Sequence, residues 1–202
     1  MMFINCFAAF VAENLTVDVT LPTQQGSVTV KSVFGWVMIH QHLGNSFNWR
    51  LSWADYKNGF GSIEDNFWLG LDKMHLFTSS QPYRLRVELQ QETTGLWYSA
   101  EFSTFTVGDE ASTYRLNVDG CNGDAGSGML IQVNSGWGFT TWDRDNDGNP
   151  NSNCASDYDG GWWHINGYYT LITSSSIHYW NTLPGDNFVI NSRMMMKQQE
   201  PV

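Results

Sequence analysis

Three neighbouring segments in the middle of the chain alternate apolar with polar residues, and turn residues separate them. They read PYRLRVELQQ (82–91), GLWYSAEFSTFTVG (95–108) and TYRLNVDG (113–120). Alternation with a period of two places the apolar side chains on one face of a strand, and short turns favour antiparallel pairing. The sequence therefore predicts an antiparallel meander with one buried face.

The segments on either side of the meander differ in character. Residues 27–39, SVTVKSVFGWVMI, alternate and are rich in Val, which predicts strands. A short helix is predicted from Ser52 to Asn58, with Ser52 as its cap and Gly59 as its end, and a second from Met74 to Thr78. From about Asn122 onward Gly, Asn, Asp and Ser dominate, so we expect a loop-rich region. Something other than the backbone hydrogen bonds of regular secondary structure must order it.

Length and charge restrict the class of protein. A chain of 202 residues suits one domain with a substantial core. The formal net charge of −10 argues against a surface that binds nucleic acid, because such surfaces need clustered Lys and Arg. An apolar stretch of about 18 residues, as a membrane-spanning helix requires, does not occur. The acidity fits a soluble extracellular protein or one that binds cations.

The first residues allow several interpretations. An apolar run from Phe3 to Ala12 lacks a basic flank and a clear cleavage site. It fits a signal peptide, a leading strand or an arbitrary start of a gene model, and we treat residues 1–26 as a separate N-terminal segment. Asn14-Leu15-Thr16 is a sequon for N-glycosylation.

The segment WDRDNDGNPNSNC (142–154) places Asp143, Asp145 and Asp147 at alternate positions before a glycine. Several carboxylates and no sulfur suit a hard cation such as Ca²⁺, and a bound divalent ion would offset their mutual repulsion. An Asp- and Asn-rich surface turn without metal is the alternative.

The segment opens like the loop of an EF-hand but does not continue as one. Counted from Asp143, the position of the usual bidentate Glu is Cys154, and Pro150 replaces the usual apolar residue. Amphipathic helices do not flank the loop. A calcium loop of another kind and a metal-free turn both remain open from these residues alone.

A set of collinear segments resembles a known family. They are GWVMIHQ (35–41), WADYKNGFGSIEDNFWLGLDKMHLFT (53–78), PYRLRVEL (82–89), YSAEFSTFTVGDEASTYRLNVDG (98–120), AGSG (125–128), FTTWDRDND (139–147), NCASDYDGGWW (153–163) and ING (165–167). In this order they resemble the fibrinogen C-terminal (fibrinogen-related) domain of ficolins, tachylectins, angiopoietins and tenascins.

The resemblance implies a secreted α+β recognition domain over residues 27–197, followed by a short tail at 198–202. It would have a small N-terminal subdomain, a central twisted antiparallel sheet with short helices, and a loop-rich C-terminal subdomain. In the family that last subdomain holds calcium and the ligand pocket. The resemblance also implies a binding module and not an enzyme. Consistent with this, the sequence contains no nucleophile elbow, P-loop or dinucleotide-binding fingerprint.

Carried over from the family's motif, the calcium ligands are the side chains of Asp145 and Asp147 and the carbonyl oxygens of Asn149 and Asn151. Asp143 becomes a supporting residue. The spacing from Asp147 to Cys154 is one residue longer than in the family, so the carbonyl of Ser152 is an alternative to that of Asn151.

The cysteines depart from the family. Cys6, Cys121 and Cys154 are an odd number, so at least one lacks a partner within the chain. The family's N-terminal disulfide is missing its second cysteine, and the family's Cys-His segment is absent after GGWW (160–163). Cys154 therefore loses its usual partner, and a pairing with Cys121 stays open. A C-terminal lobe without its disulfide should depend more on calcium.

The same missing segment forms part of the acetyl-group or peptide pocket in sugar-binding members. Tyr158 matches an aromatic residue that lines it, and Tyr179 and Trp180 fall in a later aromatic segment of the family. These three are the predicted ligand-binding residues, with the hydrophobic core as the alternative place for them. His40 and His42 share one strand face without an evident third ligand, so we expect packing or surface roles.

The sequence thus predicts a secreted, calcium-binding recognition domain without catalytic activity. Its partner would be an extracellular glycan, such as an acetylated carbohydrate bound in innate defence. The alternatives are a receptor- or matrix-binding module without lectin activity and a degenerate copy without a ligand. Any oligomer would form through regions not evident in this sequence.

Overall fold

A nine-stranded sheet forms the centre of the computed structural model, which describes residues 16–23, 26–44 and 46–199. Its main strands are β1 (Thr16–Thr23), β2 (Gly26–Val33), β3 (Trp36–Leu43), β6 (Tyr83–Gln91), β7 (Trp97–Val107), β8 (Leu116–Asn122) and β11 (Val189–Gln198). They lie in the order β1-β2-β3-β11-β6-β7-β8, and all their pairings are antiparallel. The short strands β4 (Phe60–Gly61) and β5 (Phe67–Trp68) add to the side of β3.

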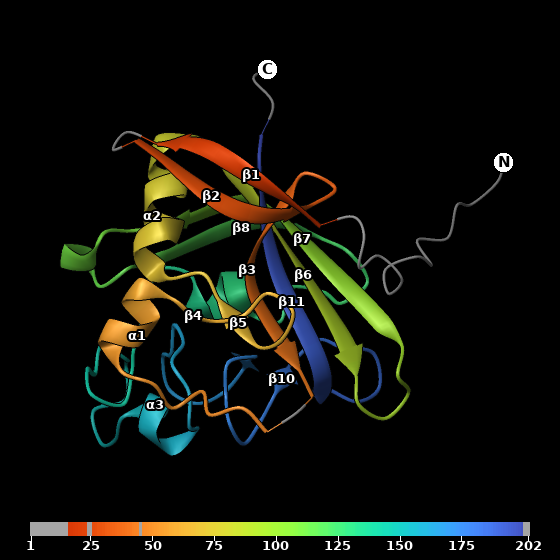
Figure 1. Cartoon of the computed structure of the whole chain (residues 1–202). Coiled ribbons are helices and arrows are strands. Elements are labelled where there is room, and N and C mark those ends of the chain that lie inside the picture. Colours follow the sequence, from red (N-terminus) through yellow and green to blue (C-terminus); the bar gives the residue numbers. More distant parts are fainter. Residues whose placement is uncertain (1–15, 24–25, 45, 200–202) are drawn as a thin grey trace, which may run out of the picture.

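The predicted meander is present as β6, β7 and β8. Leu85, Val87 and Leu89 alternate along β6 and are fully buried, and Phe102 and Phe105 of β7 are buried with them. This periodicity is why the middle of the chain could be recognised as strands. The last strand, β11, enters the sheet between β3 and β6 (Figure 1). It brings the end of the C-terminal lobe back to the centre of the domain.

The first helix forms as predicted. Helix α1 (Trp53–Asn58) starts after Ser52, whose side chain accepts a hydrogen bond from the Asp55 backbone in a capping box. It ends at Gly59, which has a φ of 94°. A Cβ atom built there would lie 2.3 Å from the Leu69 carbonyl oxygen, so only glycine fits.

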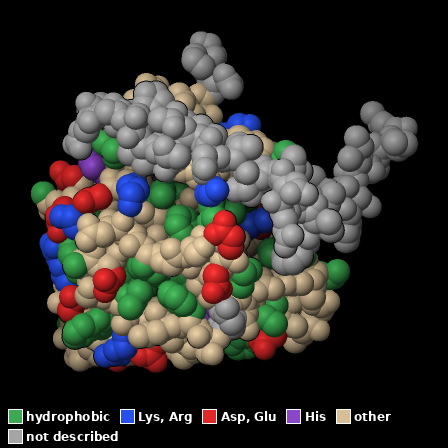
Figure 2. Space-filling view, viewed as in Figure 1, with side chains coloured by type: hydrophobic (Ala, Val, Ile, Leu, Met, Phe, Trp, Pro, Cys, Tyr) green, Lys and Arg blue, Asp and Glu red, His purple; other side chains and the backbone are tan. Residues whose placement is uncertain are grey.

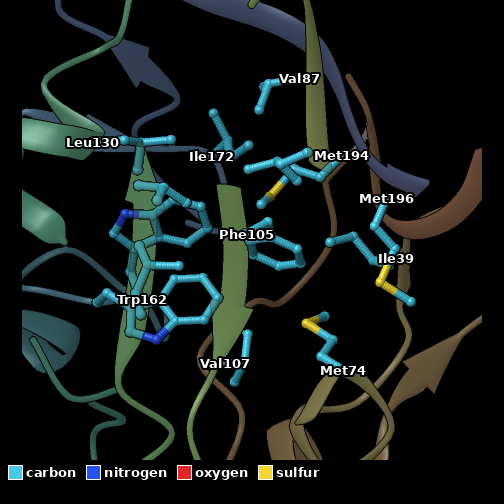
Figure 3. Packing of buried hydrophobic residues seen from close by; sticks show 14 of the residues in the cluster. Ile39, Met74, Val87, Phe105, Val107, Leu130, Trp162, Ile172, Met194 and Met196 are labelled. Atoms are coloured by element: carbon cyan, nitrogen blue, oxygen red, sulfur yellow. The ribbon is translucent and has the colours of Figure 1, made fainter. Parts of the chain in front are cut away.

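The second helix is longer than predicted. Helix α2 (Leu71–Ser80) extends the expected segment at both ends and buries Leu71, Met74 and Phe77. Figure 1 shows α1 and α2 along one side of the sheet, and Figure 3 shows side chains from α2, the sheet and the C-terminal lobe packed in one cluster. That cluster is the hydrophobic core of the domain.

The C-terminal lobe contains few regular elements, as its composition predicts. A 3₁₀ helix (Glu110–Ser112) precedes it. The lobe itself has a π-helical turn (Leu130–Asn134), α3 (Cys154–Asp157), and the two-residue strands β9 (Thr170–Leu171) and β10 (Tyr179–Trp180), which pair with each other. These loops gather at the lower end of the sheet in Figure 1. Buried aromatic residues, including Trp162 and Trp163, join the lobe to the rest of the core.

Three buried methionines lie on β11. Met194 and Met196 belong to the hydrophobic core. Met195 is buried too, and the strand register shifts between Met194 and Met195. The shift interrupts simple alternation at this point.

Several predictions about the N-terminus fall where the structure gives no description. The apolar run from Phe3 to Ala12, Cys6 and Asn14 of the sequon lie outside the described residues. Within the segment 1–26, β1 pairs along its whole length with β2. Over the described ranges, no helix is both long enough and apolar enough to cross a membrane.

Candidate functional site

The loop from Asp145 to Asn151 is a series of turns in which side-chain oxygens cap backbone amides. Asp145 Oδ1 accepts from the Asp147 amide at 3.2 Å, and Asp147 Oδ1 accepts from the Asn149 amide at 2.7 Å. Asn149 Oδ1 accepts in turn from the Asn151 amide at 3.1 Å. Each of these Asx turns fixes the residue that caps the next turn. The loop therefore has a defined path although it does not pair as a strand.

Asp147 also reaches across to the following helix. Its Oδ2 accepts from the Cys154 amide at 2.7 Å, at the first residue of α3. Tyr158, at the other end of α3, donates its amide to the Cys154 carbonyl at 2.9 Å. The carboxylate of Asp147 is therefore coupled through one short helix to Tyr158.

Asp143 serves a different purpose from its two neighbours. Its Oδ1 accepts from the backbone amide of Trp53 at 2.9 Å and from the Thr141 hydroxyl at 2.7 Å. It thus binds the start of α1, some ninety positions earlier in the chain. This agrees with a supporting role for Asp143.

The atoms left in the loop have the chemistry of a calcium site. Within the part of the chain that the structure describes, no hydrogen bond ends on the backbone carbonyl oxygens of Asn149, Asn151 or Ser152. A carboxylate oxygen that accepts one N–H retains a second lone pair, so Asp145 and Asp147 can still ligate an ion. Carboxylate and carbonyl oxygens without sulfur are what Ca²⁺ prefers.

The described residues contain no group of three His, Cys, Asp or Glu side chains that could hold a metal ion. A calcium ion would need backbone carbonyls and water beside the two carboxylates. That composition agrees with the set carried over from the family, in which two ligands are carbonyl oxygens.

The two cysteines of the described chain are both free thiols. Cys121 and Cys154 do not pair, which answers the question that the sequence left open. Burial raises the pKa of the Cys154 thiol to about 11, and the neighbouring Asp147 carboxylate adds to the shift. Cys154 is therefore a buried packing residue rather than a reactive thiol.

A row of four aromatic side chains runs from α3 to the start of β11. Tyr158 packs edge-to-face on Tyr168, with ring centroids 5.0 Å apart, and Tyr168 packs in the same way on Tyr179 at 5.3 Å. Tyr179 continues to Phe188 at 5.7 Å. We call these four residues the aromatic row.

The row stays accessible to solvent. Tyr168 is 40% exposed and Phe188 is 46% exposed, while Tyr158 and Tyr179 are half-buried. Burial raises the pKa of the Tyr158 phenol, so this hydroxyl remains protonated and can donate a hydrogen bond. A row of partly exposed aromatic rings with phenol groups can bind an apolar face and a polar group together.

Pairing of two short strands makes the row continuous. Residues Tyr179 and Trp180 of β10 lie opposite Leu171 and Thr170 of β9. The Asn181 amide donates to the Tyr169 carbonyl at 3.1 Å, which brings the segment around Tyr168 against the segment around Tyr179.

The structure places two of the three predicted ligand residues in this row and removes the third. Tyr158 and Tyr179 belong to the row, but Trp180 is fully buried. The Trp180 indole donates to the Ala125 carbonyl at 3.0 Å, and Gly128 lies against its ring. Successive residues of a strand point to opposite sides, so Tyr179 faces outward and Trp180 faces the core. The prediction that Trp180 lines the ligand surface is wrong.

Sequence reasoning missed Tyr168 and Phe188. Both follow turn residues in a region without periodicity, so no pattern marked them as neighbours of Tyr158 or Tyr179. The available signal was that each is a large aromatic residue directly after turn residues.

The histidines of β3 have packing roles, as predicted, but their third partner was missed. His40 is fully buried and His42 is 4% exposed. The His178 ring stacks on His42, with centroids 3.7 Å apart and 12° between planes. Burial lowers the pKa of His42 to about 4 and that of His178 to about 3, so both rings are neutral near neutral pH.

The chain as a whole is acidic, with a formal charge of −10. Figure 2 shows carboxylates and basic side chains spread over the face in view, with hydrophobic side chains between them in its lower half. Cations are therefore attracted to this molecule in general.

The fold and the loop-rich C-terminal lobe are those of a fibrinogen-like domain. The family of fibrinogen beta and gamma chains, C-terminal globular domain, matches residues 29–199, and the chain belongs to this family. Domains with this fold are ligand-binding modules and not enzymes.

Particular relatives are similar over most of the chain. Fibrinogen-like protein A of Apostichopus parvimensis is 36% identical over 163 residues, which are 76% of this chain and 56% of the relative. Human fibroleukin is 36% identical over 164 residues, 75% of this chain and 37% of the relative. Tenascin-R of Gallus gallus is 38% identical over 136 residues, 67% of this chain and 10% of the relative. This chain thus spans little more than half, or less, of the curated relatives it matches.

Solved structures with a similar fold are fibrinogen-like domains. The fibrinogen-like globe domain of human ANGPTL2 has a TM-score of 0.83 at 25% identity, and the match covers 94% of this chain and 95% of that one. The corresponding domain of human ANGPTL6 has a TM-score of 0.81 at 24% identity, covering 94% and 92%.

Proposed function

We propose that this chain is an extracellular recognition domain that binds its ligand on the aromatic row and holds Ca²⁺ in the adjacent loop. The single observation that carries this proposal is the continuous, partly exposed row Tyr158–Tyr168–Tyr179–Phe188. Exposed aromatic residues in a contiguous group are the usual anchors of binding surfaces. Membership in a family of recognition domains supports the same proposal.

In this proposal Ca²⁺ is held by the side chains of Asp145 and Asp147 and the carbonyls of Asn149 and Asn151, with Ser152 as the alternative to Asn151. When bound, the ion would offset the repulsion between the carboxylates and fix the turns of the loop.

The chain's own residues then transmit this order to the ligand surface. Asp147 holds the first amide of α3, and α3 ends at Tyr158, the first ring of the row. A fixed Asp147 carboxylate therefore fixes the position of Tyr158. Because α3 has only four residues, little of the loop's motion could be absorbed between the two points.

Two ligand classes suit such a row. Aromatic rings bind the apolar face of a sugar or its acetyl group, which would make the domain a lectin of innate defence. The same rings also anchor protein ligands, which would make it a receptor- or matrix-binding module. The second class suits this chain because the family's Cys-His wall of the acetyl pocket is missing from its sequence.

Binding screens with matched variants test the proposal. The full chain with Ca²⁺ is applied to a glycan array and to a library of extracellular protein ectodomains. Tyr168→Ala should abolish retention of any ligand found, while Phe34→Ala, an exposed aromatic residue at the β2–β3 turn, should retain it. A ligand that binds both variants equally, or a chain that retains nothing in either screen, would contradict the proposed surface.

A further inference from the structure

A hollow lies directly beside the end of the aromatic row. Its volume is about 360 Å³, and Phe188, the last ring of the row, forms part of its wall. Ile177 and Ile190 add apolar surface, and Glu92 and the stacked pair His42 and His178 supply the titratable groups. We call this hollow the Glu92 pocket.

Hydrogen bonds between its walls make the Glu92 pocket a formed feature of the fold. The Glu92 amide donates to the Phe188 carbonyl at 3.0 Å, and the Val189 amide donates to the His178 carbonyl at 3.1 Å. The Gly44 amide donates to Asn191 Oδ1 at 2.7 Å. The end of β3, the turn after β6, the start of β11 and the loop before β10 are thereby held against one another.

The pocket carries one unbalanced negative charge. Neither Lys nor Arg lines it, and none of the ion pairs found within the described ranges involves Glu92. The two imidazoles do not compensate for this carboxylate, because burial keeps the pKa values of His42 and His178 far below neutrality. At neutral pH the pocket therefore presents a carboxylate, neutral rings and serine hydroxyls.

The apolar part of the pocket faces the solvent as well. Phe188 is 46% exposed and Ile190 is 39% exposed. An aromatic face next to a carboxylate attracts a cation through two interactions, one with the ring quadrupole and one with the negative charge. The methylene groups of a long cationic side chain can lie along Phe188 and Ile190 at the same time.

From this arrangement we propose that the Glu92 pocket binds a lysine or arginine side chain of a protein ligand that also lies on the aromatic row. This inference rests on the proposed recognition function and selects a basic protein segment as its ligand. Neutral acetylated sugars offer no positive charge to Glu92, so a glycan would leave the most distinctive group of the pocket unused. The net charge of −10 favours a basic partner in addition.

Small probes test the pocket without knowledge of the natural ligand. Methyl resonances of Ile177 and Ile190 report on the pocket, and ring resonances of Tyr168 report on the aromatic row. The full chain is titrated with n-butylguanidinium and n-butylammonium, with n-butanol as the neutral analogue of similar length and with N-acetylglucosamine. Both cations should shift the isoleucine methyls and bind about tenfold more tightly than n-butanol.

Charge variants then identify the responsible group. Glu92→Gln preserves size and should bring the affinity for both cations down to that of n-butanol, a loss of about tenfold. Asp119→Asn, which removes an exposed carboxylate from the edge strand β8, should leave it unchanged. Equal binding of the cations and n-butanol, equal effects of the two variants, or methyl shifts with N-acetylglucosamine alone would each overturn the inference.

This outcome is distinct from that of the recognition function. One result is that the aromatic row binds a ligand, Tyr168→Ala abolishes that binding, and the cations leave the methyl resonances of Ile177 and Ile190 unshifted. The proposed binding surface is then supported, and the inference of a basic ligand fails. If the cations bind in the pocket but no ligand depends on Tyr168, the pocket chemistry holds but its assignment to a protein ligand on the row is overturned.

Discussion

The carboxylate of Asp143 accepts a hydrogen bond from the backbone amide of Trp53 at 2.9 Å, and so joins the acidic loop to the first residue of α1. Arg144, the next residue, places its guanidinium 3.9 Å from the centre of the Trp53 ring. The Trp53 indole donates to Glu110, which also pairs with Lys57. One tryptophan thus links α1 to Asp143 and Arg144 of the acidic segment and to Glu110 of the 3₁₀ helix.

Truncation of Asp143 will weaken this link. Asp143→Ala leaves the Trp53 amide without its acceptor and should lower the free energy of unfolding by about 1–2 kcal/mol. Asp143→Asn keeps an oxygen acceptor and should lose less. Denaturant unfolding of the three proteins measures the difference, and an equal loss in both variants would show that charge rather than the hydrogen bond matters.

Calcium will stabilise the domain. A ligand bound only to the folded state adds about 2.7 kcal/mol at a concentration of 100 times its Kd, so the Tm should rise with Ca²⁺ and fall with a chelator. Mg²⁺ should act less, because it requires a tighter octahedral shell. Isothermal titration gives the affinity directly.

Variants of the loop provide the control for calcium. Asp145→Asn and Asp147→Asn should remove the Ca²⁺-dependent rise in Tm, and Asp186→Asn, a carboxylate outside the loop, should retain it. A calcium response that survives in both loop variants would exclude the assigned site.

Loss of the Tyr56 hydroxyl will destabilise the core. This buried hydroxyl donates to the Trp49 carbonyl at 2.8 Å and accepts from the Gly161 amide at 3.0 Å. Tyr56→Phe leaves the Gly161 amide unpaired, while the Trp49 carbonyl keeps its second donor, the Leu51 amide. The substitution should cost about 1–3 kcal/mol, read as a lower Tm. Because Gly161 belongs to the C-terminal lobe, protease cleavage within that lobe should also become faster. An unchanged Tm would mean that water replaces the hydroxyl.

Acid will unfold the domain through its buried histidines. Burial lowers the pKa of His42 and His164 to about 4 and that of His178 to about 3. Their pKa values in the unfolded chain are near 6.5, so below that pH the unfolded state binds protons that the folded state does not. Stability is present above about pH 6.5 and is lost as the pH falls toward 4, by up to about 1.4 kcal/mol per pH unit for each ring.

Denaturant unfolding between about pH 7 and about pH 5, where most carboxylates stay charged, isolates this effect. His42→Gln and His178→Gln should each flatten the slope of unfolding free energy against pH. A slope that neither variant changes would assign the acid sensitivity to other groups.

The thiols of Cys121 and Cys154 will differ in reactivity. Cys154 is 1% exposed and its pKa is raised to about 11, whereas Cys121 is half-buried with a smaller rise of its pKa. Because the thiolate is the reactive form, iodoacetamide should label Cys121 first in the native protein. Denaturation should equalise the two rates, as peptide mass spectrometry can show. Rapid native labelling of Cys154 would mean that α3 opens readily.

The regular part of the fold could be predicted because its signals are local. Alternation marked β6 to β8, and Ser52 with Gly59 marked both ends of α1. The position of β11 between β3 and β6 could not be predicted in the same way, since pairing partners far apart in the chain leave no local pattern. The resemblance to the family, and not periodicity, gave the overall architecture.

The candidate site shows the same division. The loop residues Asp145 and Asp147 could be found because they are close in sequence. Tyr179 and Trp180 could not be separated from each other, because only the pairing of β10 with β9 determines which of them faces outward. Glu92, Phe188 and His178 come from three separate segments, and no sequence signal joins them.

The sequence by itself determined the central meander, the capped helix and the oxygen-rich loop, because each depends on residues within a few positions of one another. It also indicated the family, through collinear segments spread over residues 35–167. Only the tertiary structure decided which aromatic rings form the exposed row and that an unpaired Glu92 stands beside them. Those relationships depend on side chains brought together by the antiparallel packing of distant strands, and such contacts exist only once the chain has folded.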